Sequence, residues 1–171
     1  MTFARTKLMM QDNCFEKDPG DVELKYVGPH VSKLYDFIHQ TLKSVFNIPP
    51  SAIQEEKYNW GKGETEKISV SIVTHKDLDM FTYIYLKISF KADGNDKTGN
   101  AVITIKPYLR TEYPQDTLWQ RSLFYEMLRT IWHRIFYSKK RDEYLEECRH
   151  LVYMMQDRLR EFFKQLREKA A

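Results

Sequence analysis

Apolar residues between positions 30 and 46 recur at spacings of three and four, which is the period of an amphipathic helix. The stripe consists of Val31, Leu34, Tyr35, Ile38, Leu42, Val45 and Phe46. Pro29 precedes it, and Asn47, Pro49 and Pro50 follow it, which are residue types that begin and end helices. The pattern predicts a helix over 30–46.

From residue 52 to residue 110 the apolar period changes to two, which is typical of β-strands. The clearest run places Met80, Thr82, Ile84, Leu86, Ile88 and Phe90 on one face and Phe81, Tyr83, Tyr85, Lys87, Ser89 and Lys91 on the other. Residues 68–72 and 101–110 alternate in the same way, 22–26 is a shorter run, and 53–60 a weaker one. Short links rich in turn residues join the runs from 53 onwards, which favours antiparallel hairpins.

Two more stripes of helical period follow residue 113. The first contains Phe124, Met127, Leu128, Ile131, Trp132, Ile135 and Phe136, and the second contains Tyr144, Cys148, Leu151, Val152, Met155, Leu159, Phe162, Phe163 and Leu166. Thr117 and Gln120 have the spacing of a capping box before the first stripe. The polar run 137–141 favours a bend between two helices, and we expect both helices to cover the aliphatic face of the sheet.

These patterns predict an α+β protein with an antiparallel sheet of about four to five strands. An N-terminal helix and two long C-terminal helices are expected to pack on one face of that sheet. We divide the chain into a loosely ordered N-terminal segment (1–20), an α+β domain (21–137) and a C-terminal amphipathic helix (138–171). That last helix is expected to pack on the domain or to serve in assembly.

Composition narrows the class of protein. With 171 residues, 42% of them hydrophobic, the chain can build a core. It has no apolar run near the ~20 residues of a membrane span, and its start lacks the pattern of a secretory signal, so we expect a cytoplasmic protein. The two cysteines cannot build a disulfide framework.

The charge balance is mild. The net charge is +3, and the excess lies in residues 118–171, which hold 12 basic and 8 acidic residues. Such a balance neither demands nor excludes nucleic acid as a partner.

The first candidate site is the sheet face opposite the aliphatic one. Its predicted binding residues are Phe81, Tyr83, Tyr85, Lys87, Lys91, Lys106, Tyr108 and Arg110. Bases stack on aromatic rings for roughly 1–3 kcal/mol each, and lysines attract phosphates, so the face is a candidate for single-stranded nucleic acid. The alternative interpretation is ordinary strand composition, because tyrosine favours sheets and lysine protects their edges.

The second candidate is the last helix as an assembly surface for a protein partner or a second copy. Its predicted contact residues are Cys148, Leu151, Met155, Leu159 and Phe162, flanked by the basic residues Arg158 and Lys164. In the alternative, which we favour, this helix folds back onto its own domain.

Catalytic and metal chemistry find little support. Glu147 and His150 have the Glu-x-x-His spacing of di-iron bundles, but the chain lacks the second such pair that these sites need. The histidines are dispersed, and no phosphate loop, calcium loop or nucleophile elbow occurs. We therefore predict no catalytic residue, no metal and no cofactor, and an enzyme is the less favoured class.

The sequence thus favours a non-enzymatic protein that binds or assembles macromolecules, with RNA or the ribosome among the candidate partners and a homodimer as one form. It predicts no membrane span. The alternative is a helix-grip protein that holds a lipid-like small molecule in an apolar cavity under the last helix.

Overall fold

The structure is a computed structural model that describes residues 9–15, 20–63 and 65–169. Its elements are β1 (Met9–Asn13), β2 (Val22–Val27), α1 (Lys33–Phe46), the 3-10 turn η1 (Pro50–Ala52), β3 (Ile53–Lys62), β4 (Glu66–Asp77), β5 (Thr82–Gly94), β6 (Gly99–Glu112), α2 (Leu123–Trp132), the π-helical turn η2 (His133–Tyr137) and α3 (Ser138–Glu168). The protein is therefore of mixed α+β type, as the sequence predicts.

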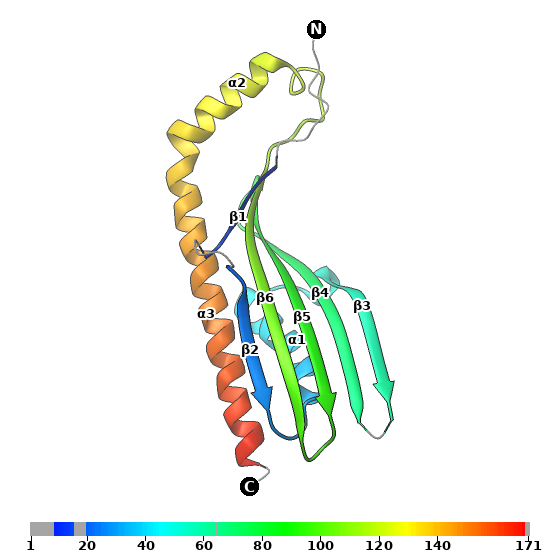
Figure 1. Cartoon of the computed structure of the whole chain (residues 1–171). Helices are drawn as coiled ribbons and strands as arrows, with labels where there is room; N and C mark the ends of the chain where they lie inside the picture. The colour runs from blue at the N-terminus through cyan, green and yellow to red at the C-terminus, as the bar shows by residue number, and fades with distance from the viewer. Residues whose placement is uncertain (1–8, 16–19, 64, 170–171) are drawn as a thin grey trace.

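All six strands form one antiparallel sheet (Figure 1). The order is β1-β6-β5-β4-β3, and β2 also pairs with β6, so β1 and β2 share one edge of that strand. The strand count is higher than the four to five expected. The additional strand is β1, which lies inside the segment predicted to be loosely ordered, where a five-residue run is too short for its alternation to be read reliably.

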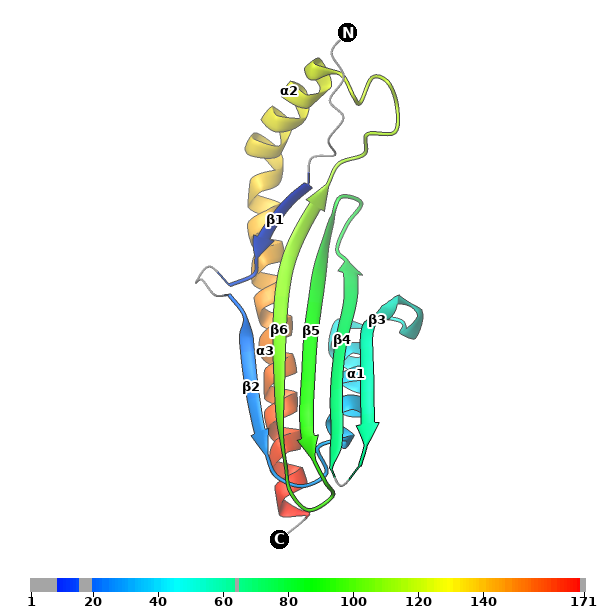
Figure 2. The same ribbon diagram turned by 45° about the vertical axis from the view of Figure 1, so that its right-hand side comes forward.

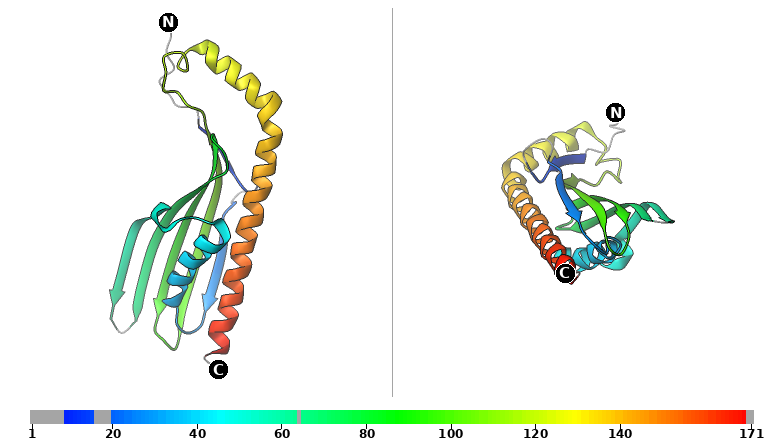
Figure 3. Two further views of the ribbon diagram at one scale, coloured as in Figure 1. Left: turned by 180° about the vertical axis from the view of Figure 1, so that it is seen from behind. Right: turned by 60° about the horizontal axis from the view of Figure 1, so that its bottom comes forward.

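Helix α1 and most of α3 cover the same face of the sheet (Figure 3). Inward-facing β5 and β6 side chains, among them Ile88 and Ile105, are buried against them. The two helices meet through the rings of Phe37 and Phe162, which stack with centroids 3.9 Å apart. Asn47 ends α1 in the left-handed conformation, with φ of 54°, which asparagine tolerates better than most residues.

The C-terminal helices differ from the prediction. Only α3, 31 residues long, packs on the sheet, whereas α2 lies beyond the sheet's end (Figure 2). The helix changes direction between α2 and α3 at the π-helical turn η2, directly before the bend expected at 137–141, and continues as α3 without a break (Figure 1). The expectation of two long helices packed on one face is therefore wrong, because β6 ends at Glu112 and offers α2 no sheet to cover.

A disulfide bond joins Cys14, which follows β1, to Cys148 in α3 across a sequence separation of 134 residues. Sequence analysis did not pair these cysteines, since two of them so far apart carry no spacing signal. The bond fixes the end of β1 to the helix that covers the sheet.

Candidate functional site: the α2 arm and the cavities beneath it

The part of the chain that projects past the sheet is residues 113–137, which we call the arm (Figure 1). It comprises the segment after β6, then α2 and η2. Its large apolar side chains are exposed by 40% to 73%: Leu118, Trp119, Leu123, Phe124, Met127, Leu128, Ile131, Trp132, Ile135 and Phe136. Monomeric proteins rarely expose an apolar patch of this size.

The inner side of the same helix is polar. Arg129 is only 5% exposed, pairs with Glu126 one turn earlier, and lies over the ring of Tyr113 at 5.2 Å. His133 shares a hydrogen bond of 2.7 Å between Nδ1 and the hydroxyl of Tyr113. The polar side of the helix therefore binds its own protein while most of its apolar side is exposed, the reverse of a surface helix in a globular domain. Leu128 and Trp132, at the margin of the apolar side, also face a cavity beside the helix.

Asp79, in the turn between β4 and β5, anchors the root of the arm. Its carboxylate accepts hydrogen bonds of 2.8 Å from the backbone N–H groups of Phe81 and Thr82. It also accepts from the hydroxyls of Tyr137 at 2.7 Å and Tyr144 at 3.1 Å. One carboxylate thus joins the sheet, η2 and α3.

The protonation of Asp79 reflects these contacts. Burial alone would raise the pKa of its carboxyl, but the hydrogen bonds from Phe81, Tyr137, Thr82 and Tyr144 more than compensate, and the net pKa lies below the ordinary value. The charged form is therefore the one that the fold stabilises.

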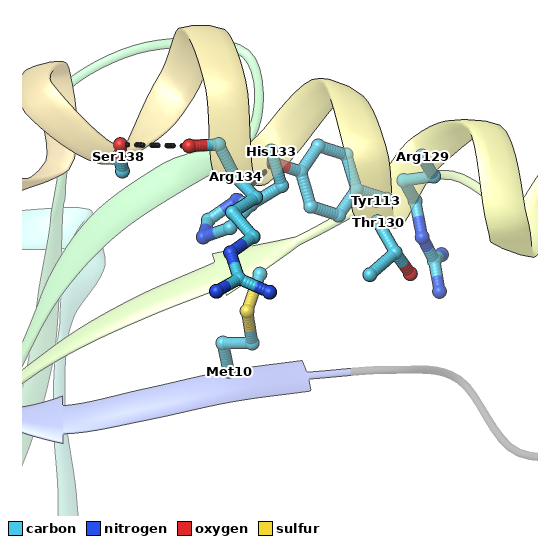
Figure 4. A pocket seen from close by; sticks show the side chains of 7 residues that line it. All are labelled: Met10, Tyr113, Arg129, Thr130, His133, Arg134 and Ser138. Atoms are coloured by element: carbon cyan, nitrogen blue, oxygen red, sulfur yellow. Dashed lines mark hydrogen bonds between the residues drawn. The ribbon is translucent and has the colours of Figure 1, made fainter.

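Two cavities lie on either side of Arg129, beneath and beside α2. The first has a volume of about 350 Å³, and its lining includes Met10, His133 and Arg134 (Figure 4). The second has a volume of about 370 Å³, and its lining is mainly aromatic and apolar: Phe81, Trp119, Tyr125, Leu128 and Trp132. Tyr113 and Arg129 line both. The lining of each cavity is mostly apolar, and the first differs in that Arg134 and His133 also line it.

Arg129 is the least satisfied polar group of the arm. Its Nη2 donates to Glu126, but the buried Nε and Nη1 atoms have no hydrogen-bond acceptor among the described residues. A buried donor without a partner costs about 1–3 kcal/mol, and more when charged. Arginine keeps its charge at any physiological pH, so it cannot avoid this cost by losing a proton.

The two titratable neighbours of Arg129, Tyr113 and His133, are both held in their neutral forms. Burial raises the pKa of Tyr113 to about 12, against the opposing effect of Arg129 and Arg141, so the phenol stays protonated. Burial and the charge of Arg141 hold the pKa of His133 below its ordinary value, although Asp12 opposes them. The Nδ1 atom of a neutral His133 can accept a hydrogen bond from the hydroxyl group of Tyr113.

The predicted nucleic-acid surface lies on the sheet face opposite the helices. This face carries Tyr83, Tyr85, Lys87, Lys91, Lys106, Tyr108 and Arg110, which are half-buried except for the exposed Lys91. Phe81 is apart from them, because its ring packs against Tyr113 and Trp132 under the arm.

Most cations on that face have partners within the protein. Lys87 binds Glu56 at 3.2 Å, and Lys106 binds Asp21 at 2.6 Å. The guanidinium of Arg110 lies 3.6 Å from the centre of the Tyr85 ring. The structure thus brings the predicted residues together, but neighbouring acids neutralise part of their charge. Binding of nucleic acid there stays a prediction.

The predicted assembly helix is α3. Cys148 is in the disulfide, and Leu151, Met155 and Leu159 are buried in the core. Phe162 is partly buried against α1, whereas Arg158 and Lys164 are exposed. These apolar residues pack within the protein and are not offered to a second chain.

The space between α3 and the sheet, where the helix-grip hypothesis places a ligand, contains apolar side chains. Val152, Leu159 and Phe163 belong to the same buried cluster as the inward residues of the sheet. The cavities at the arm lie elsewhere, around α2, so a ligand in the helix-grip position stays a prediction that the packing does not favour.

Sequence reasoning missed the residues that matter at the arm. Arg129, His133 and Asp79 gave no motif, since their partners are distant in sequence. The available signal was a helix of strong apolar periodicity with a basic residue opposite its stripe, which alone does not say which side faces the protein.

Among the described residues, no three His, Cys, Asp or Glu side chains cluster closely enough to hold a metal ion. Within the same part of the chain, none of the helices is sufficiently long and apolar to cross a bilayer.

Comparison with known proteins gives no functional class. No protein-family model matches the sequence, and no curated protein matches it. A solved structure of a Staphylococcus aureus protein of unknown function aligns with 85% of this chain and 94% of its own, at 13% identity and a TM-score of 0.27. A TM-score this low carries no argument about fold or function.

Proposed function

We propose that the protein is a non-enzymatic assembly protein that pairs with a second copy of itself through the apolar side of the arm. The observation that carries this proposal is the orientation of α2, whose polar side is bound internally while its apolar side is exposed. Exposed apolar surface on a rigid helix is stabilised when a partner covers it.

The size of the apolar surface supports a second protein chain as the occupant. Ten large side chains that are 40% to 73% exposed leave roughly 1,000 Å² of apolar surface, given that aromatic side chains alone bury 150–250 Å² each. A stable interface needs about 800 Å² on each partner. The arm alone meets that size.

The pattern of the surface supports a second copy in particular. Phe124, Leu128, Ile131 and Ile135 recur at three- and four-residue spacings, the pattern by which helices pack against helices. A two-fold axis across α2 would bring the same apolar patch of each copy together, the commonest arrangement among homo-oligomers.

The test measures solution mass over a range of protein concentrations by light scattering after gel filtration. We expect a dimer for the wild-type protein and a monomer for Met127→Glu and Ile131→Glu, because a charge in an apolar interface loses its hydration. Val27→Glu is the matched control, since Val27 is as exposed as Met127 but lies on β2, away from the arm.

Two results would overturn the proposal. One is a monomeric wild-type protein at every concentration. The other is a monomer that sediments with vesicles of anionic lipid and loses this property in Ile131→Glu, which would assign the apolar side to a membrane surface instead.

A disulfide is typical of oxidising environments, which counts against the expected cytoplasmic location.

A further inference from the structure

The two cavities at Arg129 are not explained by self-association of the arm. The buried Nε and Nη1 atoms of Arg129 are donors without an acceptor among the described residues, and this side chain lines both cavities. Arg134 also lines the first cavity; its side chain is exposed and has no hydrogen-bond or ion-pair partner among the residues described. In Figure 4 both arginine side chains leave α2 and η2 on the side of β1.

We propose that these cavities bind an anionic amphiphile, a carboxylate or phosphate group carried on an apolar chain. The oxyanion accepts hydrogen bonds from Arg129 and Arg134 at the first cavity. The apolar chain occupies the compartment lined by Phe81, Trp119 and Trp132. This site is additional to the self-association proposed above.

The charge balance of the first compartment favours an anion. Glu126 neutralises one unit of charge at Arg129, and Gln115 also binds that carboxylate at 2.6 Å. Arg141, at the base of the arm, is paired with Asp12. Arg134 has no acidic partner among the described residues, so its positive charge is not neutralised within the protein. Guanidinium groups bind carboxylates and phosphates through several N–H donors, so an oxyanion supplies the acceptors that Arg129 lacks.

The neighbouring compartment favours an apolar chain. Its lining is aromatic on several sides, and the rings of Phe81, Tyr113 and Trp132 contact one another edge-on or tilted, with centroids 5.2 to 6.2 Å apart. At about 370 Å³ it lies within the range of small-molecule sites. Tyr113 and Arg129 border both compartments, so the two are neighbours, and we place the charged end of one ligand in the first and its chain in the second.

The experiment titrates dodecanoate, dodecyl phosphate and the neutral dodecanol, each below its aggregation concentration, into the full-length protein by isothermal titration calorimetry. We expect saturable binding of one or both anions at one site per chain and much weaker binding of dodecanol. Whichever anion binds more tightly distinguishes a carboxylate from a phosphate ligand. Inorganic phosphate is titrated as the probe that lacks an apolar chain.

Arg129→Met should weaken binding of the anion by about ten- to a hundredfold, because it removes charge-assisted hydrogen bonds. Arg134→Met is a second variant at a more exposed position, for the case that Arg129→Met does not fold. Arg158→Met is the matched control, an exposed arginine on α3 that lines neither cavity.

The proposal is overturned if dodecanol binds as tightly as the anions, if inorganic phosphate binds as tightly as dodecyl phosphate, or if neither arginine variant weakens binding. Its failure is separable from failure of the assembly proposal. Met127→Glu, which disrupts the arm's apolar side, changes a residue that lines neither cavity and is expected to keep the ligand affinity.

Discussion

The C-terminal half of α3 and the arm are two helical regions with the same apolar periodicity and opposite orientation. Leu159 in α3 is fully buried, whereas Leu123 at the start of α2 is 58% exposed. One stripe packs into the sheet and α1, and the other lies on the surface. The difference shows that an amphipathic pattern specifies that a helix has an apolar side but not what that side contacts.

The physical reason is the extent of the sheet. Under α3, inward residues of β5 and β6 supply an apolar surface that matches the stripe. Beside α2, the protein offers groups that bind the polar side of the helix, such as the hydroxyl of Tyr113 and the side chain of Gln115, and a ring, that of Phe81, which contacts only Trp132 at the margin of the apolar side. The arm therefore orients itself by polar contacts, and its apolar side is available to another molecule.

The strongest test of this difference between α3 and the arm is the same leucine-to-alanine change made once in each region. Leu159→Ala should lower the free energy of unfolding by about 2–5 kcal/mol, because it leaves a cavity in a close-packed core. Leu123→Ala should change it by no more than about 0.5 kcal/mol when the protein is monomeric, since an exposed side chain loses little. Urea unfolding at low protein concentration measures both. Equal losses would mean that the arm is packed as tightly as α3.

A second prediction concerns the root of the arm. Asp79→Asn should lower the free energy of unfolding by about 1.5–3 kcal/mol, the range for hydrogen bonds to a charged group. Hydrogen exchange should rise in η2 and the first turns of α3, where Tyr137 and Tyr144 lose their charged acceptor. Asp157→Asn is the control, because Asp157 is exposed and its nearest cation is 3.9 Å away. A uniform rise in exchange would contradict a local anchor.

The smallest effect we expect is a response to acid. The pKa of His133 in the fold lies below the ~6.5 of an unfolded histidine. The unfolded chain therefore takes up the proton first, and stability that is complete above about pH 6.5 declines as the pH falls toward the folded pKa. His133→Gln should remove this decline, and His150→Gln, at an exposed position, should keep it. Unfolding midpoints between pH 7.5 and 5.5 report the difference.

Much of the fold could be predicted from the sequence. The alternation from Ile84 to Phe90 fixed both the strand and its buried side, and the stripe that ends at Phe46 fixed α1 and its stop at Asn47. These succeeded because each element contacts an apolar surface along its whole length. For such an element, the spacing of its apolar residues is enough to predict which side chains are buried.

The candidate site could not be predicted for the converse reason. The contacts that define it join residues far apart in sequence, such as Asp79 with Tyr137 and Cys14 with Cys148. Arg129 lies on a polar side that a single sequence assigns to solvent, and only the three-dimensional arrangement shows that it is buried. Where two elements contact each other through polar groups, the hydrophobic periodicity of the sequence does not indicate which residues pair.

The bond between Cys14 and Cys148 has a mechanical consequence. A force applied at the two chain ends can detach only β1 and the part of α3 after Cys148 before it reaches the covalent link, since these two pieces lie outside the closed loop. While the sulfurs remain joined, the 134-residue loop cannot lengthen, which withholds roughly 450 Å of extended chain. Strands β2 to β6 and the arm lie inside that loop, so tension on the chain ends cannot extend them until a reductant opens the disulfide.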